Sequence, residues 1–377
     1  MKIAFELVRY EAAPVNVECN NLTFRSERTK RLLRISIAIV AIICTVVFTP
    51  WDVLRVWAAP LPNTIQEQVN NAIGRRLDGI IVYVDKKGRE PEFYSAGWKN
   101  KENKVPADPH ALFKIASISK LYIAAATAKL VSNKSLSLDK TLAEYLPELA
   151  GRIENADQIT LRMLLQHRSD IPNFTDDPRF PWFKPSTNSN EILNLVLDKP
   201  ADFKPGSRYS YSNTNYLLIG NILDKTLGYS HRQYIKKEIL DPLGLTHTYG
   251  LLSEVDLKEV VSRYISDYNG DLKALDYVNP GGSMVATAQD VGIFLRALND
   301  GTLLNHDEQA IYSSIYVYEH TGLLPGYQSI ARYHKDIDTV VILFMNTSGG
   351  DSWTKIEIIY NRIIRILRRQ SAKQIQS

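Results

Sequence analysis

The feature that most constrains this chain is an apolar run without charge near its N-terminus. Residues 35–51 read ISIAIVAIICTVVFTPW and contain no charged side chain. A helix needs about 17–25 such residues to cross the hydrocarbon core of a bilayer. A buried core helix is the alternative, but five of the ten residues before the run are basic, which is typical of a membrane border. The sequence therefore predicts a transmembrane anchor at 35–51.

The charges around this run predict how the chain crosses the membrane. The basic block precedes the run, so the positive-inside rule leaves residues 1–34 as a cytoplasmic basic segment. Residues 52–64 read as a linker, and we expect a single-pass protein whose main domain is extracytoplasmic, either periplasmic or extracellular. A cleaved signal peptide competes, because VWAA at 56–59 resembles a small-residue cleavage site. The long segment before the run favours an uncleaved anchor.

The net charge of +4 lies at the two ends of the chain. Residues 1–34 carry +3 and residues 362–377 carry +5, which leaves −4 between them. A mildly acidic body argues against nucleic acid as a partner. Both cysteines, Cys19 and Cys44, lie in the first fifty residues, and no two histidines have the i, i+4 spacing of a helical metal site. The sequence indicates no metal and no cofactor, and it leaves the oligomeric state open.

Beyond the linker, strand patterns occur at both ends of the chain and helical patterns occur between them. Strands are predicted at 79–98 (two strands joined at 86–91), 310–320, 327–334 and 339–346. Helical spacing marks 65–77, 355–369, a long segment after Phe113 and much of the middle region. This order predicts an α+β domain at 65–370, an antiparallel sheet flanked by helices, with a helical insertion at about 136–278.

The segment FKIASISKLYIAAATAKLV (113–131) places Ser117 and Lys120 one helical turn apart, in front of an apolar helix. Residues three apart share a helix face. Burial disfavours the charged form of a lysine and lowers its pKa, so Lys120 can accept the proton of a serine hydroxyl. The same spacing occurs at Ser137–Lys140 and Ser352–Lys355, but only the first pair leads straight into a long apolar helix.

Two further motifs follow along the chain. Tyr211-Ser212-Asn213 lies on a turn, where a phenol and an amide two residues apart can point into one cleft, although Tyr277-Val278-Asn279 repeats the spacing. His320-Thr321-Gly322 ends a predicted strand, where glycine permits close approach of a substrate backbone. Taken alone, the His-Thr-Gly motif is much more typical of a structural histidine at a strand end.

Together and in this order, the three motifs resemble those of the serine β-lactamases and penicillin-binding proteins. The branch that fits contains class C β-lactamases, D-alanyl-D-alanine carboxypeptidases and related esterases. Segments 159–172, 242–250 and 281–295 are similar to that branch as well, and the resemblance covers roughly 63–367. It implies a β-lactamase/transpeptidase-like fold and a serine hydrolase that works through an acyl-enzyme.

The resemblance also implies a role for each motif residue. Ser117 would be the nucleophile, Lys120 and Tyr211 would exchange its proton, and Asn213 would orient the substrate amide. His320 and Thr321 would line the strand edge near a substrate carboxylate, and Gly322 precedes Leu323, whose N–H would form an oxyanion hole with that of Ser117.

Two positions depart from the pattern. Class C β-lactamases usually carry lysine where this chain has His320, and that histidine looks more like the carboxypeptidase members. Asp170, in HRSDIP, stands where relatives commonly have glycine.

The expected function is therefore a membrane-anchored D,D-carboxypeptidase-like enzyme acting on cell-wall peptides. A β-lactamase or carboxylesterase of the same fold is a second possibility, and the substrate would be a peptide or a β-lactam-like small molecule. A non-catalytic receptor acylated by β-lactams is a third possibility. Turnover of the acyl-enzyme separates the enzymes from the receptor.

Overall fold

The computed structural model describes residues 27–73, 77–266, 268 and 270–376, and the chain forms two compact units, Met1–Ala59 and Pro60–Ser377. In the first unit, α1 spans Glu27–Phe48 and α2 spans Trp51–Ala58. Most of the predicted cytoplasmic segment, residues 1–26, lies outside the described residues.

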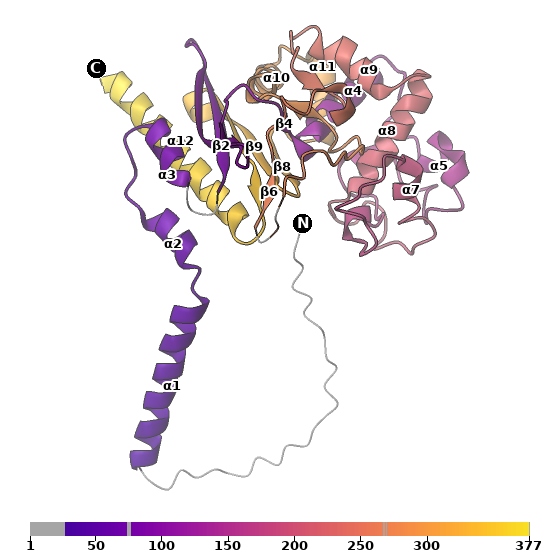
Figure 1. The fold of residues 1–377 in the computed structure, drawn as a ribbon. Coiled ribbons are helices and arrows are strands. Elements are labelled where there is room, and N and C mark those ends of the chain that lie inside the picture. The colour runs from indigo at the N-terminus through magenta and orange to yellow at the C-terminus, as the bar shows by residue number, and fades with distance from the viewer. Residues whose placement is uncertain (1–26, 74–76, 267, 269, 377) are drawn as a thin grey trace, which may run out of the picture. The chain divides into compact units, whose positions relative to one another are not determined.

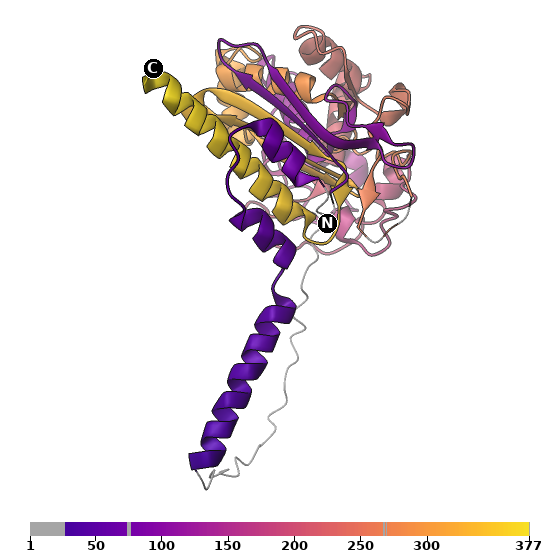
Figure 2. The same cartoon turned by 60° about the vertical axis from the view of Figure 1, so that its left-hand side comes forward.

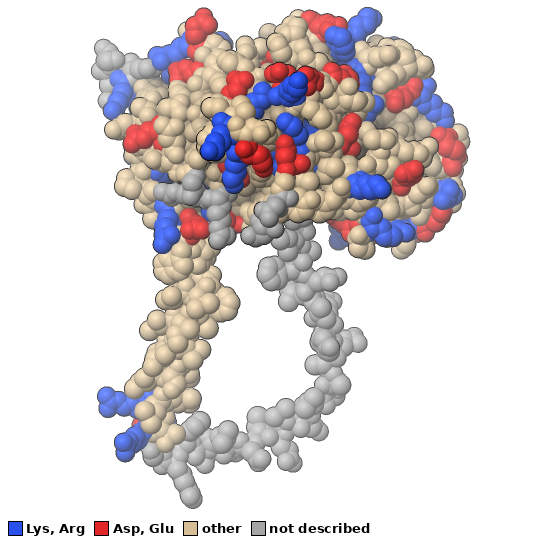
Figure 3. Space-filling model, in the orientation of Figure 1, with Lys and Arg blue, Asp and Glu red and all other residues tan. Residues whose placement is uncertain are grey.

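Helix α1 is long and apolar enough to cross a membrane, with a mean hydropathy of 2.3 over its most apolar window and no buried residue. It begins inside the basic block and ends just before Pro50, whose ring cannot continue a helix. Figure 3 shows basic side chains at one end of this helix and uncharged side chains over the rest. Helix α2 occupies part of the segment predicted as a linker.

The second unit contains all the remaining elements. Its helices are α3 (Ile65–Ala72), α4 (Ser119–Ser132), α5 (Leu142–Tyr145), α6 (Leu161–Leu165), α7 (Ser189–Leu193), α8 (Asn213–Leu227), α9 (His231–Ile235), α10 (Ala288–Asp300), α11 (His306–Ile315) and α12 (Ser352–Gln376), with short helical turns η1 (Ala116–Ile118), η2 (Pro147–Leu149), η3 (Phe174–Asp176), η4 (Lys236–Leu240), η5 (Leu252–Glu254) and η6 (Lys335–Ile337). Its strands are β1 (Gly79–Lys86), β2 (Glu92–Asn100), β3 (Val105–Pro106), β4 (Phe113–Lys114), β5 (Thr248–Tyr249), β6 (Tyr264–Ile265), β7 (Val285–Ala286), β8 (His320–Leu324), β9 (Tyr327–His334), β10 (Thr339–Met345) and β11 (Thr347–Ser348).

A six-stranded antiparallel sheet, in the order β3-β2-β1-β10-β9-β8, forms the centre of this unit. Helices α3 and α12 cover one face and α10 and α4 lie over the other (Figure 1). Because both faces are covered, every residue of β10 is buried, which explains the unbroken apolar run TVVILFM. The predicted fold class is confirmed.

The middle of the chain, between α4 and β7, consists of helices joined by loops. It contains α5 to α9, with two short strands, β5 and β6. Figures 1 and 2 show these helices gathered beside the sheet, away from α12. Strand β5 returns to pair with β7, which also pairs with β4. The chain therefore leaves the sheet region after α4 and comes back to it before α10.

The strand predicted at 310–320 is wrong over most of its length. Residues 306–315 form helix α11, and only His320 belongs to a strand. Asn305 caps the helix by accepting from the Glu308 N–H, and the Glu308 carboxylate accepts from the Asn305 N–H in return. This capping box starts a helix, and it outweighs the aromatic and β-branched residues that favoured a strand.

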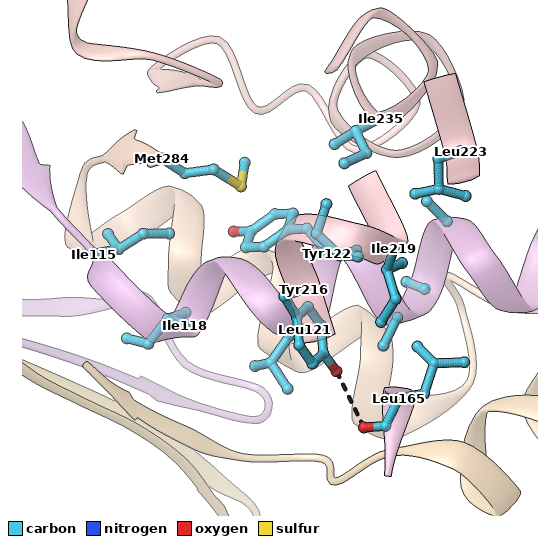
Figure 4. Close-up of a cluster of buried hydrophobic side chains, with 14 of the residues drawn as sticks. Ile115, Ile118, Leu121, Tyr122, Leu165, Tyr216, Ile219, Leu223, Ile235 and Met284 are labelled. Carbon is cyan, nitrogen blue, oxygen red and sulfur yellow. Dashed lines mark hydrogen bonds between the residues drawn. The ribbon is translucent and has the colours of Figure 1, made fainter. Parts of the chain in front are cut away.

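Helix α4 is buried on all sides, as expected for a helix that is apolar around its whole circumference. Side chains from several other elements surround it, as Figure 4 shows for Tyr216 of α8 and Leu165 of α6. The Tyr216 hydroxyl donates to the Leu165 carbonyl over 3.5 Å, next to α4. The helix that carries Lys120 is thus fixed by the core itself.

The structure explains why Asp170 is an unusual choice at its position. Its φ of +74° lies in the left-handed region that glycine adopts at least cost. One carboxylate oxygen accepts from the Asn155 amide over 3.0 Å, and the other has no partner among the described residues. Burial raises the Asp170 pKa to about 6. Since this pKa lies above the unfolded value, Asp170 favours folding in acid and loses that contribution as the pH rises through about 6.

Candidate active site

Ser117 lies on a strained turn in front of α4. The sequence places it in the first turn of the helix, whereas the structure places it in η1, just before α4 begins. Between residues 111 and 128, Ser117 is the one residue that is not buried. The preceding Ala116 has a φ of +52°, a conformation that costs a non-glycine residue free energy and is characteristic of functional sites. The turn therefore presents a single hydroxyl from an otherwise buried segment.

Three oxygen atoms surround the amine of Lys120. Its Nζ lies 2.8 Å from the Gly281 carbonyl, 2.9 Å from Asn213 Oδ1 and 3.1 Å from Ser117 Oγ. A neutral amine has two N–H donors and one lone pair. If Gly281 and Asn213 accept the two N–H bonds, the lone pair faces the serine hydroxyl, which is the arrangement that general-base catalysis needs.

The environment of Lys120 favours the neutral amine. The side chain is completely buried, and this desolvation lowers its pKa from 10.5 to about 7. The faces of the Tyr211 and Tyr216 rings lie near Nζ, at 5.0 and 5.3 Å from their centroids. No carboxylate pairs with this lysine in the described part of the chain. Lys120 can therefore exchange a proton near neutral pH.

Tyr211 is the second residue that contacts the Ser117 hydroxyl. Its hydroxyl donates to Ser117 Oγ over 2.8 Å, and burial raises its pKa above the usual value. The phenol is therefore protonated at neutral pH and acts as a donor. Ser117 Oγ thus lies between a base, Lys120, and an acid, Tyr211.

Several residues that the sequence reasoning did not assign hold this cluster in place. The His167 ring stacks on Tyr211 with centroids 4.4 Å apart, and its Nδ1 accepts from the Ser212 N–H. Asn173 Oδ1 accepts from the Asn213 N–H, and the Asn213 amide donates to Thr175 Oγ1. His167 lies within the segment at 159–172 that resembles the family, and Asn173 and Thr175 follow it directly. That resemblance is the only signal the sequence offers for these residues.

Two glycines allow the parts of the site to approach one another. A Cβ on Gly281 would lie 3.0 Å from Lys120 Nζ and 2.7 Å from Tyr216 Cβ. A Cβ on Gly322 would lie 2.3 Å from the Ile115 carbonyl and 2.2 Å from Ser329 Oγ. The lack of a side chain at Gly322 thus lets the turn that carries Ser117 pack closely against β8. The expected approach of a substrate backbone at Gly322 stays a prediction. Leu323, the next residue, lines the same pocket as Ser117.

His320 lies at the start of β8 with both ring nitrogens occupied. Nδ1 donates to the Thr321 carbonyl, and Nε2 accepts from the Tyr316 hydroxyl over 2.9 Å. Burial, together with the nearby charge of Lys120, lowers the His320 pKa to about 4. The histidine is therefore neutral at pH 7. The centroid of its ring lies 6.5 Å from that of the Tyr211 ring. The next residue, Thr321, is half-buried.

The pocket at Ser117 is small, apolar and uncharged. It has a volume of about 60 Å³. Its aromatic lining comes from Phe174, Phe180, Trp182 and Tyr277. No lysine, arginine, aspartate or glutamate is among the described residues that line it. This pocket accommodates an uncharged apolar group next to the serine.

The competing motifs lie elsewhere or make other contacts. Ser137 is exposed, and Ser352 is buried, where its hydroxyl accepts from Gln328. Tyr277 and Asn279 line the pocket, but the Tyr277 hydroxyl donates to the Trp182 carbonyl over 2.6 Å. The described residues contain no group of three or more His, Cys, Asp or Glu placed to hold a metal ion.

Comparison with known proteins connects this geometry to a family. The family model described as Beta-lactamase matches residues 63–315. Among curated proteins, a putative D-alanyl-D-alanine carboxypeptidase of Escherichia coli (strain K12) is 28% identical over 61% of this chain and 51% of its own length. Protein flp of Staphylococcus aureus (strain NCTC 8325 / PS 47) is 27% identical over 50% of this chain and 39% of its own. The chain spans about half or less of these relatives.

Solved structures share the fold at low sequence identity. The D-amino acid amidase of Ochrobactrum anthropi SV3, complexed with L-phenylalanine amide, superposes with a TM-score of 0.73 at 23% identity, over 81% of this chain and 98% of that chain. A class C beta-lactamase from Rhodobacter sphaeroides gives a TM-score of 0.65 at 20% identity, over 81% of this chain and all of the other. With the family model covering more than half of the sequence, the chain belongs to the beta-lactamase family.

Proposed function

We propose that this protein is a membrane-anchored serine hydrolase that cleaves an amide or ester through an acyl-enzyme on Ser117. The observation that carries the proposal is the position of Ser117 Oγ, 3.1 Å from the amine of Lys120 and 2.8 Å from the hydroxyl of Tyr211. A serine with a base on one side and an acid on the other has what each half of an acyl transfer requires.

The reaction follows from these contacts. Ser117 Oγ attacks the substrate carbonyl carbon while Lys120 takes its proton. The N–H groups of Ser117 and Leu323 would stabilise the oxyanion, a contribution that is typically worth about 3–4 kcal/mol. Tyr211 gives its proton to the leaving group and regains one from Lys120. Water then cleaves the acyl-enzyme by the same steps in reverse.

The lack of charged side chains among the described residues of the pocket favours an uncharged substrate. No cation lines the pocket among the described residues, and His320 is neutral with both nitrogens bonded. A substrate carboxylate placed there would lose its hydration without gaining a counter-ion, which is unfavourable. The geometry thus best supports an amidase or esterase whose substrate is uncharged on both sides of the scissile bond.

A D,D-carboxypeptidase-like activity on cell-wall peptides is the second candidate. It is supported by the order of the three motifs and by the similarity to the E. coli protein described as a putative D-alanyl-D-alanine carboxypeptidase. This candidate requires the enzyme to bind a terminal carboxylate. The two candidates therefore differ in how the enzyme responds to one charge on the leaving group.

We expect Ser117→Ala to lower covalent labelling by a fluorophosphonate at least about a thousandfold, because among the described residues Ser117 is the one serine or threonine whose hydroxyl contacts Lys120 Nζ. The Ser117 side chain caps no helix, so the thermal unfolding temperature should change little. Ser137→Ala and Ser352→Ala are matched controls, because each removes the serine of one of the other two Ser-x-x-Lys motifs. Both variants should be labelled at the wild-type rate. Labelling of the Ser117→Ala protein at the wild-type rate would contradict the assignment.

The acylation rate should rise with pH and level off above about 7. Below the Lys120 pKa of about 7 the amine is protonated and cannot take the serine proton, so the rate should fall about tenfold for each pH unit. Stopped-flow acylation by an uncharged probe from pH 5 to 9 measures this.

Lys114 provides the control for this pH profile. It is also buried, its pKa is also lowered to about 7, and it donates to the Leu275 carbonyl rather than to Ser117. Lys114→Met should leave the midpoint of the profile in place. A flat profile in the wild type, or a midpoint lost with Lys114, would show that another group is the base.

The leaving-group charge separates the two candidate functions. We expect an acyl-D-alanyl-D-alaninamide to acylate the enzyme at least about tenfold faster than the matching acyl-D-alanyl-D-alanine, because the cleft offers no cation. His320→Lys should raise the rate on the carboxylate by up to about a hundredfold, the effect of one charge-assisted hydrogen bond. His320→Gln, which adds no charge, is the control. A wild type that prefers the carboxylate would instead support the carboxypeptidase.

We also propose that the domain beyond α1 is extracytoplasmic, because the basic residues precede the apolar segment. A reporter that is active only in an oxidising compartment, fused after Ser377, should be active. Activity of a cytoplasmic reporter at the same junction would reverse the orientation.

A further inference from the structure

A second cavity lies beside the candidate active site, separated from it by one loop. It has a volume of about 380 Å³, within the range of small-molecule sites. Residues 277–284 line both spaces. Tyr277, Val278, Asn279, Gly281 and Gly282 face the Ser117 pocket, whereas Pro280, Ser283 and Met284 face the second cavity. The two cavities share no lining residue, so this loop is their common wall.

Most of the cavity wall is apolar. The buried side chains of Ile123, Ile235, Leu240 and Met284 contribute to it. Figure 4 shows Ile235 and Met284 on the same side of α4. Ile123 lies on α4, three residues after Lys120. A ligand here would therefore bury an apolar body against the helix that carries the catalytic lysine.

Arg232 supplies a cation to this apolar wall. Its Nη2 donates to the Val278 carbonyl over 2.9 Å, the one hydrogen bond of this side chain to a described residue, while its buried Nε has no partner among the described residues. Guanidinium groups are strong donors and usually bind carboxylates through two N–H groups at once. Burial lowers the pKa of Arg232 although Asp224, Glu254 and Asp276 act to raise it. None of these carboxylates forms an ion pair with it.

The other ionisable groups of the cavity do not take over this role. Lys236 and Glu254 are both exposed and carry opposite charges. His231 is buried, its Nδ1 is paired with Asp224 over 2.7 Å, and its pKa is lowered by burial. Arg232 is thus a half-buried cationic group on the lining that forms no ion pair with a carboxylate among the described residues.

We propose that this cavity binds a small carboxylate with an apolar body and that the bound ligand slows acylation of Ser117. The carboxylate would pair with the Arg232 guanidinium, and the apolar body would lie against Ile123 and Leu240. The binding step stands on its own, whereas the effect on acylation rests on the proposed function.

The coupling follows a short chain of contacts. Arg232 holds the Val278 carbonyl, and Val278 belongs to the loop whose Gly281 carbonyl accepts from Lys120 over 2.8 Å. Asn279 fastens this loop internally, since its carbonyl accepts from the Gly282 N–H. A carboxylate that draws the guanidinium away from Val278 releases this loop. Lys120 then loses an acceptor that orients its lone pair toward the serine.

Phenylacetate is a suitable probe, and 2-phenylethanol is its uncharged counterpart. Isothermal titration of the full chain in lipid nanodiscs should show one saturable phenylacetate site, with the alcohol bound at least about tenfold more weakly. Arg232→Gln should weaken phenylacetate binding at least about tenfold. Arg152→Gln removes an exposed arginine that pairs with Asp198 and should bind normally. Ser117→Ala should also bind normally, which separates this site from the proposed reaction.

The effect on acylation is measured with the fluorophosphonate. Saturating phenylacetate should lower the maximal acylation rate at least about threefold, and the effect should vanish in Arg232→Gln. Leu251→Trp, which fills the cavity from its rim, is a second variant in case Arg232→Gln does not fold. Absence of saturable binding, equal binding of the alcohol, or unchanged binding by Arg232→Gln would overturn the site. If an excess of the fluorophosphonate restores the acylation rate, phenylacetate competes at Ser117 itself, and the proposed coupling is overturned.

Discussion

The burial of Lys120 is the constraint on which the rest of the site depends. An amine enclosed in a core loses hydration, and three oxygen atoms, from Gly281, Asn213 and Ser117, replace it. Their positions require α4 to be buried on all sides, a glycine at 281 and a helix α8 that begins at Asn213. This packing lowers the pKa of Lys120 to about 7. The same burial that disfavours the charged amine thus makes the neutral amine available as a base.

The described residues that line the Ser117 pocket carry no charge. Aromatic side chains such as Phe174 and Trp182 form the pocket, and His320 is neutral because it is buried beside the lysine. Uncharged surroundings thus favour the same lysine as a base and disfavour a charged substrate. Both properties have one physical origin.

The loop 277–284 connects the candidate active site to the rest of the unit. Its residues line two cavities, and two of its carbonyl groups accept hydrogen bonds from the side chains of Lys120 and Arg232. A loop held at two points by side chains of two different helices transmits displacement from one side to the other. This arrangement makes the geometry at Ser117 sensitive to what lies behind the loop.

The sequence alone determined the features that depend on local pattern. The uncharged run predicts α1, the apolar run TVVILFM predicts the buried β10, and the spacing of Ser117 and Lys120 identifies the pair that precedes a buried helix. The prediction failed at 310–315, where the capping box at Asn305 prevailed over strand propensity. Only the tertiary structure decided three contacts. The Gly281 carbonyl accepts from Lys120, the Tyr316 hydroxyl donates to His320 Nε2, and Arg232 donates to the Val278 carbonyl of loop 277–284. The sequence around each of these residues does not predict its partner, because the packing of other elements brings the two residues together.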